Sequence, residues 1–273
     1  MERLAVIGDP VGHSLSPLIH MTWIDTLGLE ASYESIRVPE GQTASALDDF
    51  LREGFRGLNV TLPHKQAVLD KVARRSEAVD AIGAANTLTH LGDEGWRADN
   101  TDAPGLIMAL ARMGLKDLSG KTVLILGAGG AARAALFALD RAGADIFLLN
   151  RTVDKAAAVL AACCERPHQH GPLDDLTRHA DSADLIINTT SAGHGGAVIE
   201  LPAGNGRLFY DISYGAPAAA QLSHAREQGW ETEDGLAMLV CQAAESFAIW
   251  FDGTRPDLEA AITVCRDYME AGE

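Results

Sequence analysis

The sequence predicts an α/β protein built from two domains. Predicted strands and helices alternate through residues 1–102, as they do in α/β units. The segment GAGGAA, residues 127–132, lies between an apolar strand and an Ala-rich helix, which is the context of a dinucleotide-binding turn. The 273 residues also suffice for two ordinary domains. We therefore expect a first domain at 1–102, a Rossmann-type domain at 103–236 and a C-terminal helical region at 237–273.

The first domain begins with alternating strands and helices. Residues 3–8, RLAVIG, form a short apolar run rich in β-forming residues, which predicts a strand. A helix is expected at 16–28, because Ser16 suits an N-cap, a proline suits the first helical position and a glycine follows the end. A strand at 32–38 and a helix at 43–54, closed by glycine, come next.

The segment NVTLPHK marks the end of a strand expected at 57–63. Pro63 breaks that strand, and His64 and Lys65 follow at once, with a helix expected at 64–73. Either ionisable side chain is a candidate for chemistry here, and the histidine has the ordinary pKa closer to neutrality. Farther along, AANTLTH and GWRADN flank LGDE, which predicts a β-hairpin.

The second domain is expected to follow a long helix at 102–114 that links the two domains. A strand at 122–126 leads into the glycine loop and the Ala-rich helix, and the next strand ends before Asn150. The later elements are expected to be a helix at 153–164, strands at 184–190 and 208–214, a helix at 217–228 and a helical tail from Gly235.

Charge and cysteine content limit the class of partner. The chain has 22 Lys and Arg against 38 Asp and Glu, a net charge of −16, which argues against binding to a nucleic-acid backbone. The four cysteines show no zinc-like spacing, so we expect free thiols and no metal site. The N-terminus lacks a secretory pattern and no apolar stretch suits a membrane span, so we expect a cytoplasmic protein.

The glycine loop has the G-x-G-x-x-A pattern of a dinucleotide-binding turn. Gly127 allows the tight turn, Gly129 lets the backbone approach a pyrophosphate, and Ala132 lets the helix pack closely on the strand. The phosphates would then meet free N–H groups at a helix N-terminus. The alternative is a structural Gly-rich turn, which the flanking strand and helix disfavour.

The next strand end predicts which dinucleotide binds. An NAD site usually ends this strand with an acid that binds the ribose 2′-hydroxyl. Here the strand ends in Asn150, Arg151 and Thr152, and the nearest acid, Asp154, falls inside the following helix. Arg151 can bind a 2′-phosphate and stack on adenine, with Lys155 one helical turn away. We therefore expect NADP, and the alternative for Arg151 is a solvated surface charge.

Candidate substrate residues gather at strand ends in the first domain. A ketone that accepts hydride needs a proton donor, and a lysine beside an acid can supply one. Lys65 and Asp102 offer such a pair, and the hydroxyls and amides of HSLSP, NVTLP and ANT suit a polyol. Each residue also has a structural alternative: Ser16 and Asp102 as helix caps, Asn86 in a turn, and Lys65 as a surface charge.

Eight motifs in order make the chain resemble the shikimate dehydrogenase family. They are GHSLSP, NVTLPHK, GAANTL, DNTD, GAGGAAR, NRT, YDISY and DGLAMLVCQAAESF, and they cover nearly the whole chain. The resemblance implies NADPH-dependent, reversible reduction of 3-dehydroshikimate to shikimate in chorismate and aromatic amino-acid biosynthesis. It also implies a first domain that binds the substrate, a second that binds NADP, and C-terminal helices that return to the first domain.

The resemblance further implies roles for individual residues. The family's catalytic pair falls on Lys65 and Asp102. The implied substrate contacts are Ser14, Ser16, Thr61, Asn86, Tyr214 and Gln242, with the two serines holding the carboxylate. The implied cofactor contacts are Glu77, Gly127, Ala128, Gly129, Gly130, Ala131, Asn150, Arg151, Thr152, Lys155, Ile212, Gly235 and Met238.

Departures from the family pattern leave alternatives open. The family often has Phe or Tyr at His64, Gly in place of Ala103 and Pro104, and Ala at Cys241. A quinate or shikimate-analogue dehydrogenase is the alternative enzyme, and a catalytically silent NADP-binding sensor is the alternative of another class. We expect a small-molecule substrate as partner, with no nucleic acid and no membrane, and a monomer or homodimer.

Overall fold

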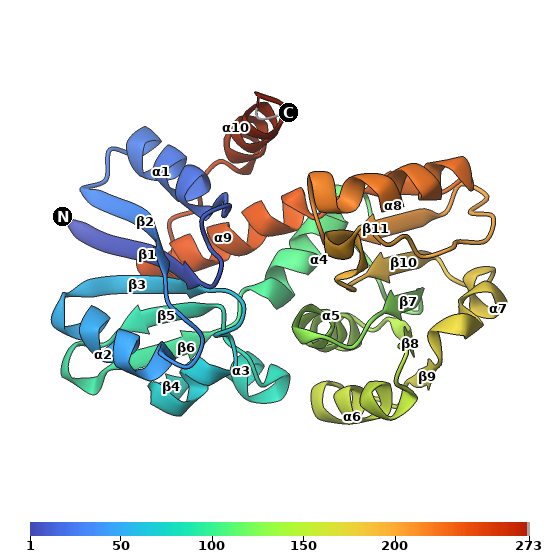
Figure 1. Cartoon of the computed structure of the whole chain (residues 1–273), viewed down its shortest axis with the longest axis horizontal. Helices are drawn as coiled ribbons and strands as arrows, with labels where there is room; N and C mark the ends of the chain where they lie inside the picture. Colours follow the sequence, from blue (N-terminus) through green and yellow to red (C-terminus); the bar gives the residue numbers. More distant parts are fainter. Residues whose placement is uncertain (272–273) are drawn as a thin grey trace. The chain divides into compact units, whose positions relative to one another are not determined.

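The computed structural model describes residues 1–271. By its contacts the chain divides into two compact units. Unit 1 comprises Met1–Gly105 and the chain from Val240 onward, and unit 2 comprises Leu106–Leu239. Both units are mixed α/β structures, as the sequence predicted (Figure 1).

Unit 1 is built on one six-stranded sheet, in the order β2-β1-β3-β5-β6-β4. The strands are β1 (Glu2–Gly8), β2 (Ala31–Arg37), β3 (Phe55–Val60), β4 (Val72–Arg75), β5 (Thr87–His90) and β6 (Trp96–Asp99). β1 runs parallel to β2 and β3, whereas β5 runs antiparallel to β3 and β6. The pairing of β5 with β6 confirms the predicted hairpin.

Helices cover both faces of this sheet. They are α1 (Ser16–Thr26), α2 (Thr43–Arg52), the short α3 (Glu77–Ile82), α9 (Leu236–Trp250) and α10 (Leu258–Ala271). On one face, Leu47 and Phe50 of α2 pack with Leu58 and Val60 in an apolar cluster. On the other face, Trp250 of α9 donates from its indole N–H to the carbonyl of Leu88 at 3.0 Å. The predicted C-terminal tail is thus two helices, α9 and α10.

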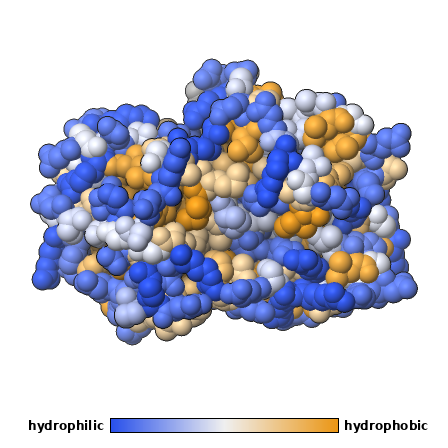
Figure 2. All heavy atoms as spheres, turned by 180° about the vertical axis from the view of Figure 1, so that it is seen from behind, coloured by the Kyte–Doolittle hydropathy of each residue, from blue (hydrophilic) through white to orange (hydrophobic). Residues whose placement is uncertain are grey.

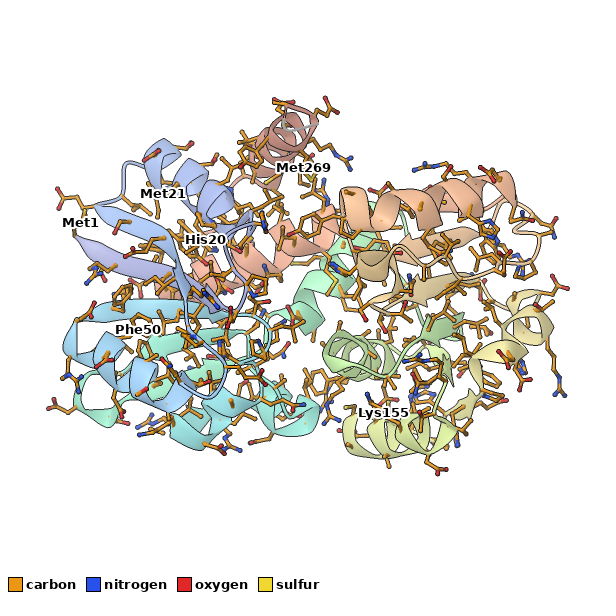
Figure 3. All side chains as sticks on the ribbon, viewed as in Figure 1. Met1, His20, Met21, Phe50, Lys155 and Met269 are labelled. Carbon is orange, nitrogen blue, oxygen red and sulfur yellow. The ribbon has the colours of Figure 1, made fainter. Side chains whose placement is uncertain are left out.

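A buried histidine joins α1 to the face that α9 covers. Figure 3 labels His20 on α1. Its ring stacks on Tyr33 of β2 at a centroid distance of 4.2 Å, and Trp250 is also in ring contact with it. Complete burial lowers the pKa of His20 to about 3, because the charged form would lose its hydration. His20 is therefore neutral at physiological pH and packs as an aromatic side chain.

Two local expectations for unit 1 were wrong. Residues 64–73 do not form a helix: a turn leads into a short 3-10 helix, η1 (Ala67–Lys71), and then into β4, which pairs with β6. Strand pairing across the sheet outweighs the local helical preference. Ser16 is also not the N-cap of α1, because Leu15 holds that position and Ser16 is the first helical residue.

Unit 2 is built on a six-stranded parallel sheet, in the order β12-β11-β10-β7-β8-β9. Its strands are β7 (Thr122–Leu126), β8 (Asp145–Leu149), β9 (Gln169–Gly171), β10 (Leu185–Asn188), β11 (Leu208–Asp211) and β12 (Glu231–Glu233). The chain builds outward from β7 through β8 to β9 and then returns to β10 on the other side of β7. This switch point between β7 and β10 is where open parallel sheets bind ligands, at the carboxyl ends of the strands.

Helices lie on both faces of the unit 2 sheet (Figure 1). They are α4 (Asp102–Arg112), which crosses the boundary between the units, α5 (Gly130–Arg141), α6 (Val153–Cys163), α7 (Leu176–Ala180) and α8 (Ala216–Glu227). Val123 and Ile125 of β7 pack with α5 and α6, whereas Leu124 and Leu126 pack with α7 and α8. The strand is apolar on both faces because both faces are covered, which confirms the Rossmann-type prediction.

The surface is mainly polar. Figure 2 shows one face of the molecule, on which hydrophilic residues predominate and hydrophobic residues form separate patches. Leu62, in the turn before Lys65, is 70% exposed. Within residues 1–271, no helix has the length and apolar character needed to cross a membrane.

Gly57 of β3 provides a stability test, because its missing side chain leaves room for Trp250. A Cβ at this position would lie 2.2 Å from the indole nitrogen of Trp250. Gly57→Ala should lower the free energy of unfolding by about 1–3 kcal/mol, the usual cost of overpacking a core. Urea denaturation followed by circular dichroism measures it. Gly12→Ala is the control, since a Cβ there meets nothing within 4 Å, and equal losses in both variants would contradict the packing argument.

Candidate active site

An ion pair lies beyond the carboxyl ends of the unit 1 strands. Lys65 stands in the turn after β3, and Asp102 is the first residue of α4, just after β6. The Lys65 Nζ lies 2.6 Å from Asp102 Oδ2, and the two side chains are 23% and 14% exposed. A charge-assisted hydrogen bond of this length holds the ammonium in place while one side remains open to solvent.

The second oxygen of Asp102 is held by Asn86. The Asn86 Nδ2 lies 2.9 Å from Asp102 Oδ1, 2.9 Å from Thr101 Oγ1 and 3.0 Å from Gln242 Oε1. The backbone N–H of Thr101 donates to Asn86 Oδ1 at 2.8 Å, which fixes the orientation of the amide. The structure therefore joins Lys65, Asp102, Asn86 and Gln242 in one connected set.

A buried polar network around Ser246 is hydrogen-bonded to Thr101, one of the partners of Asn86. The sequence analysis did not predict this network. The Ser246 hydroxyl lies 3.0 Å from Asn59 Nδ2, 2.7 Å from Thr87 Oγ1 and 3.0 Å from Thr101 Oγ1. Ser246 and Gln242 stand one helical turn apart on α9. The sequence signal for it was weak: Gln242 and Ser246 are two uncharged polar residues at helical spacing in a mainly apolar helix that also contains Glu245.

His64 is buried behind the turn that carries Lys65. Its Nε2 donates to the carbonyl of Val38 at 2.7 Å, because a carbonyl can only accept. Its Nδ1 then accepts from the Thr43 hydroxyl at 2.9 Å. Both ring nitrogens are engaged and the side chain is 1% exposed, so His64 anchors the turn to Val38, which follows β2, and to the first residue of α2.

The three hydroxyl candidates are Ser14, in the segment between β1 and α1, Ser16, and Thr61 just after β3. The Ser14 hydroxyl accepts from the backbone N–H of Ser16 at 3.2 Å, and Ser16 is buried at the start of α1. The backbone N–H of Thr61 donates to the carbonyl of Ile7 at 2.9 Å. Within residues 1–271, none of the three is hydrogen-bonded to Lys65 or Asp102.

The glycine loop of unit 2 joins β7 to α5 at the switch point. Gly127 has a φ of +97°, and a Cβ there would lie 3.0 Å from the side chain of Thr190, so conformation and space both favour glycine. Gly129 is the N-cap of α5 and offers no side chain to the free N–H groups of the first turn. Gly129 and Gly130 are exposed, and a Cβ at either would meet nothing within 4 Å.

These features fit the phosphates of a dinucleotide. A helix N-terminus without a cap keeps its N–H groups available to an anion. Ala128 and Ala132 are buried in the apolar cluster beneath the loop, which brings α5 close to β7 as the motif predicted. Ala131 lies in the first turn of α5.

The four residues expected to select the cofactor follow β8. Asn150 Nδ2 donates a hydrogen bond to the carbonyl of Thr152 at 2.9 Å. Arg151, Thr152 and Lys155 are exposed, and Lys155 projects from α6 (Figure 3). Within the described residues, neither Arg151 nor Lys155 is paired with a carboxylate. Asp154 lies in the first turn of α6, as expected.

The remaining candidates lie in both units. Ile212 and Tyr214 follow the carboxyl end of β11, and a Cβ at Gly235 would lie 1.9 Å from the carbonyl oxygen of Ile212. Met238 is buried in the apolar cluster of unit 2. Glu77 begins α3 and belongs to unit 1, whereas the other cofactor candidates belong to unit 2.

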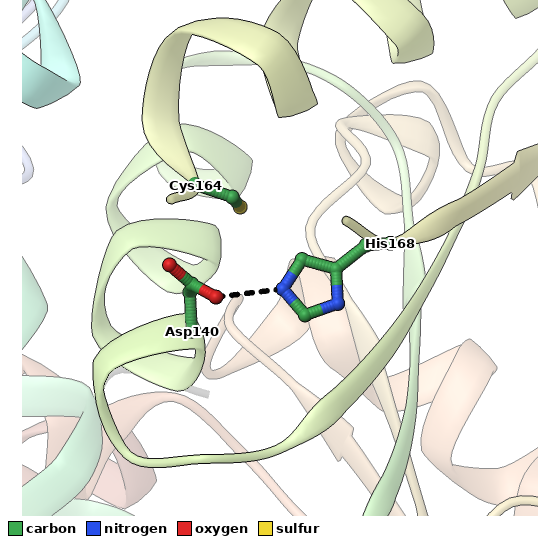
Figure 4. A group of neighbouring side chains, drawn as sticks. All are labelled: Asp140, Cys164 and His168. Atoms are coloured by element: carbon green, nitrogen blue, oxygen red, sulfur yellow. Dashed lines mark hydrogen bonds and ion pairs between the residues drawn. The ribbon is translucent and has the colours of Figure 1, made fainter. Parts of the chain in front are cut away.

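One cluster in unit 2 has metal-ligand residue types: Asp140, Cys164 and His168 (Figure 4). His168 Nε2 donates to Asp140 Oδ1 at 2.8 Å, and His168 Nδ1 accepts from the N–H of Ile146. The Asp140 carboxylate also accepts from the Glu165 N–H and from Arg166.

The hydrogen bonds of this cluster explain it without an ion. Burial alone would raise the pKa of Asp140, but the bonds from Glu165, His168 and Arg166 hold the pKa below its usual value. Burial, with Asp140 nearby, raises the pKa of Cys164 to about 12, and the Cys164 thiol donates to the carbonyl of Leu136 at 3.9 Å. The cluster cross-links α5 to the segment before β9.

Comparison with known proteins gives the family. Three family models match: a shikimate dehydrogenase substrate binding domain at 6–88, shikimate / quinate 5-dehydrogenase at 109–212, and a shikimate 5′-dehydrogenase C-terminal domain at 235–266. A shikimate dehydrogenase (NADP(+)) from Hyphomonas neptunium is 45% identical over 98% of each chain.

Solved structures of similar fold cover nearly the whole chain. The shikimate 5-dehydrogenase of Thermus thermophilus, in complex with NADP(H) and shikimate, is 36% identical with a TM-score of 0.86, covering 98% of this chain and 99% of that one. A 5-ketofructose reductase of Gluconobacter is 27% identical with a TM-score of 0.83, covering 98% of each chain. The chain belongs to the shikimate dehydrogenase family.

Proposed function

We propose that this protein is a shikimate dehydrogenase, an NADP-dependent oxidoreductase that acts on a CH–OH group. It reduces 3-dehydroshikimate reversibly to shikimate with NADPH, a step of chorismate and aromatic amino-acid biosynthesis. Membership of the family supports the reaction. The single structural observation that carries the proposal is the Lys65–Asp102 ion pair, held by Asn86.

Lys65 is the proposed proton donor. NADPH, when bound, would supply the hydride, and the substrate's carbonyl oxygen would then need a proton. The Lys65 ammonium donates a proton to that oxygen, and in the reverse direction neutral Lys65 takes the hydroxyl proton. Asp102 holds the ammonium in one position, because its own carboxylate is held by Asn86.

The proposed substrate contacts rest on the family resemblance, and the buried network supports two of them. The Ser14 and Ser16 hydroxyls are assigned to the carboxylate, and Thr61, Asn86, Gln242 and Tyr214 to the ring hydroxyls. Asn86 and Gln242 are buried and oriented by the network around Ser246, so they can discriminate the positions of hydroxyl groups. Lys65 supplies local positive charge for an anionic substrate despite the net charge of −16.

The proposed cofactor site lies at the switch point of unit 2. The first turn of α5, with Gly127 to Ala131, receives the phosphates. Arg151 and Lys155, which are exposed and without a carboxylate partner in the described chain, bind the 2′-phosphate, with Asn150 and Thr152 beside them. Ile212, Gly235 and Met238 are assigned to the nicotinamide side, and Glu77 is the one cofactor candidate in unit 1.

We also propose the cytoplasm as the compartment and a monomer or homodimer as the assembly. The four cysteines are all free thiols, as expected in a reducing compartment. Light scattering coupled to size-exclusion chromatography separates a monomer from a homodimer. A small-molecule substrate, with neither nucleic acid nor membrane, is the expected partner.

An absorbance assay at the nicotinamide band, with shikimate and NADP, tests the reaction. We expect reduction of NADP with shikimate and a much lower kcat/KM with quinate. The ion pair argues against a silent NADP-binding sensor, which has no need of a proton donor. Binding of NADP without turnover of shikimate or quinate would refute the proposal.

Removal of the Lys65 amine tests the proton donor. Lys65→Ala should lower kcat by more than about 100-fold, the lower end for general acid–base catalysis, with a much smaller change in the KM for shikimate. Lys71→Ala is the matched control, since Lys71 is an exposed lysine six residues farther on that pairs with Asp48. Near-normal turnover of Lys65→Ala would refute the assignment.

Removal of the Arg151 guanidinium tests the choice of dinucleotide. Arg151→Ala should raise the dissociation constant for NADPH by about tenfold or more, the loss of one charge-assisted contact, and leave that for NADH nearly unchanged. Titration followed by cofactor fluorescence measures both constants. Arg178→Ala in α7, another exposed arginine of unit 2, is the control. Equal losses for the two cofactors would exclude the 2′-phosphate contact.

A further inference from the structure

Two buried polar side chains face each other at the carboxyl ends of β10 and β11. Asn188 is the last residue of β10, Asp211 is the last residue of β11, and the two are register partners. Asn188 Nδ2 donates to Asp211 Oδ2 at 2.8 Å. Each residue is 2% exposed, so this contact lies out of water.

The donor and acceptor roles in this pair are unambiguous. Asn188 Oδ1 accepts from the backbone N–H of Thr190 at 3.1 Å and from its hydroxyl at 2.8 Å, so Nδ2 must face Asp211. Asp211 Oδ1 accepts from the backbone N–H of Ser213 at 2.9 Å, so Oδ2 faces Asn188. Each side chain thus binds its partner with one atom and its own following loop with the other.

Those two loops contact the rest of the switch point. Gly127, the first glycine of the phosphate loop, lies against Thr189 and Thr190, where an added Cβ would be 3.1 Å and 3.0 Å away. Ser213 accepts from the backbone N–H of Gly235 at 2.9 Å through its carbonyl. The pair therefore sets the backbone of both loops beside the turn that binds pyrophosphate in this class of sheet.

The side-chain bond of the pair is separate from the backbone ladder that joins the two strands. β10 and β11 are already joined along the register from Leu185 with Leu208 to Asn188 with Asp211. Burial raises the pKa of Asp211, although bonds from Ser213 and Asn188 oppose the shift, so the charged carboxylate carries a cost where it stands. An apolar pair would avoid that cost but could not hold the two loops by their N–H groups.

We propose that Asn188 and Asp211 are positioning residues for the NADP(H) site, acting through the loops at 189–190 and 212–213. The inference rests on the proposed function for the identity of the ligand. The two residues do not contact the ligand. They hold the backbone of residues 189–190 and 212–213 in the conformation to which the dinucleotide binds.

The Asn188–Asp211 pair can be tested by exchanging the two residues, because the exchanged pair can form the same hydrogen bonds. Asp211→Asn places two amide donors face to face, and Asn188→Asp places two carboxylates face to face. The double variant Asn188→Asp/Asp211→Asn restores one donor and one acceptor, and both loop N–H groups keep an acceptor. We expect each single variant to raise the dissociation constant for NADP by about tenfold or more, and the double variant to return within about threefold of the parent protein.

The readouts separate positioning from a general loss of structure. NADP dissociation constants come from equilibrium fluorescence titration, and thermal midpoints from circular dichroism. The KM for shikimate should stay near that of the parent protein in every variant. If one single variant fails to fold, the NADP affinity of the other single variant decides, and the double variant should fold and bind NADP as the parent does.

Three results would overturn the inference. They are unchanged NADP affinity in a folded single variant, a double variant that folds without recovering affinity, and a double variant that does not fold. The parent protein keeps this test distinct from the proposed function. If the parent binds no NADP, the proposed function fails; if the parent binds NADP and the single variants bind it equally well, only the positioning role fails.

Discussion

The ion pair between Lys65 and Asp102 requires unit 1 to hold a lysine side chain in one fixed position. A proton donor works only when its position is fixed relative to the reacting oxygen, and a flexible lysine has no fixed position of its own. Asp102 supplies the fixed partner, and the amide of Asn86 in turn fixes Asp102. The ends of β3, β5 and β6 converge on this one contact.

The buried network beneath Asn86 explains why the C-terminal helix α9 belongs to the site. Unpaired polar groups are costly in a low-dielectric interior, whereas a fully satisfied network is rigid. Ser246 of α9 reaches Asn59, Thr87 and Thr101 from more than a hundred residues away in the sequence. Trp250 fixes the same helix to the sheet where Gly57 leaves room for its ring.

Unit 2 places backbone N–H groups, instead of an ion pair, at its proposed site. Its parallel sheet places loops at the carboxyl ends of β7, β10 and β11. The backbone N–H groups of Gly127, Thr189 and Ile212 still pair with the neighbouring strand, and the loops leave the sheet after them. The α5 N-terminus leaves such groups open, whereas Asn188 and Asp211 satisfy those of their own loops. Open groups can bind a ligand, and satisfied groups keep the surrounding backbone in one conformation.

The sequence by itself determined the features whose signals are local. Apolar runs predicted β1 and β7, and the glycine pattern predicted the turn into α5. The sequence analysis named Asp102 as an acid able to pair with Lys65, and the structure contains that ion pair. Only the tertiary structure decided that residues 64–73 end in a strand and that Leu15, not Ser16, occupies the N-cap position of α1. It alone also placed Ser246 and the Asn188–Asp211 pair beside the two proposed sites. These outcomes depend on partners distant in sequence, because β4 forms only where β6 offers its edge and a buried polar group is stable only where folding brings its partner.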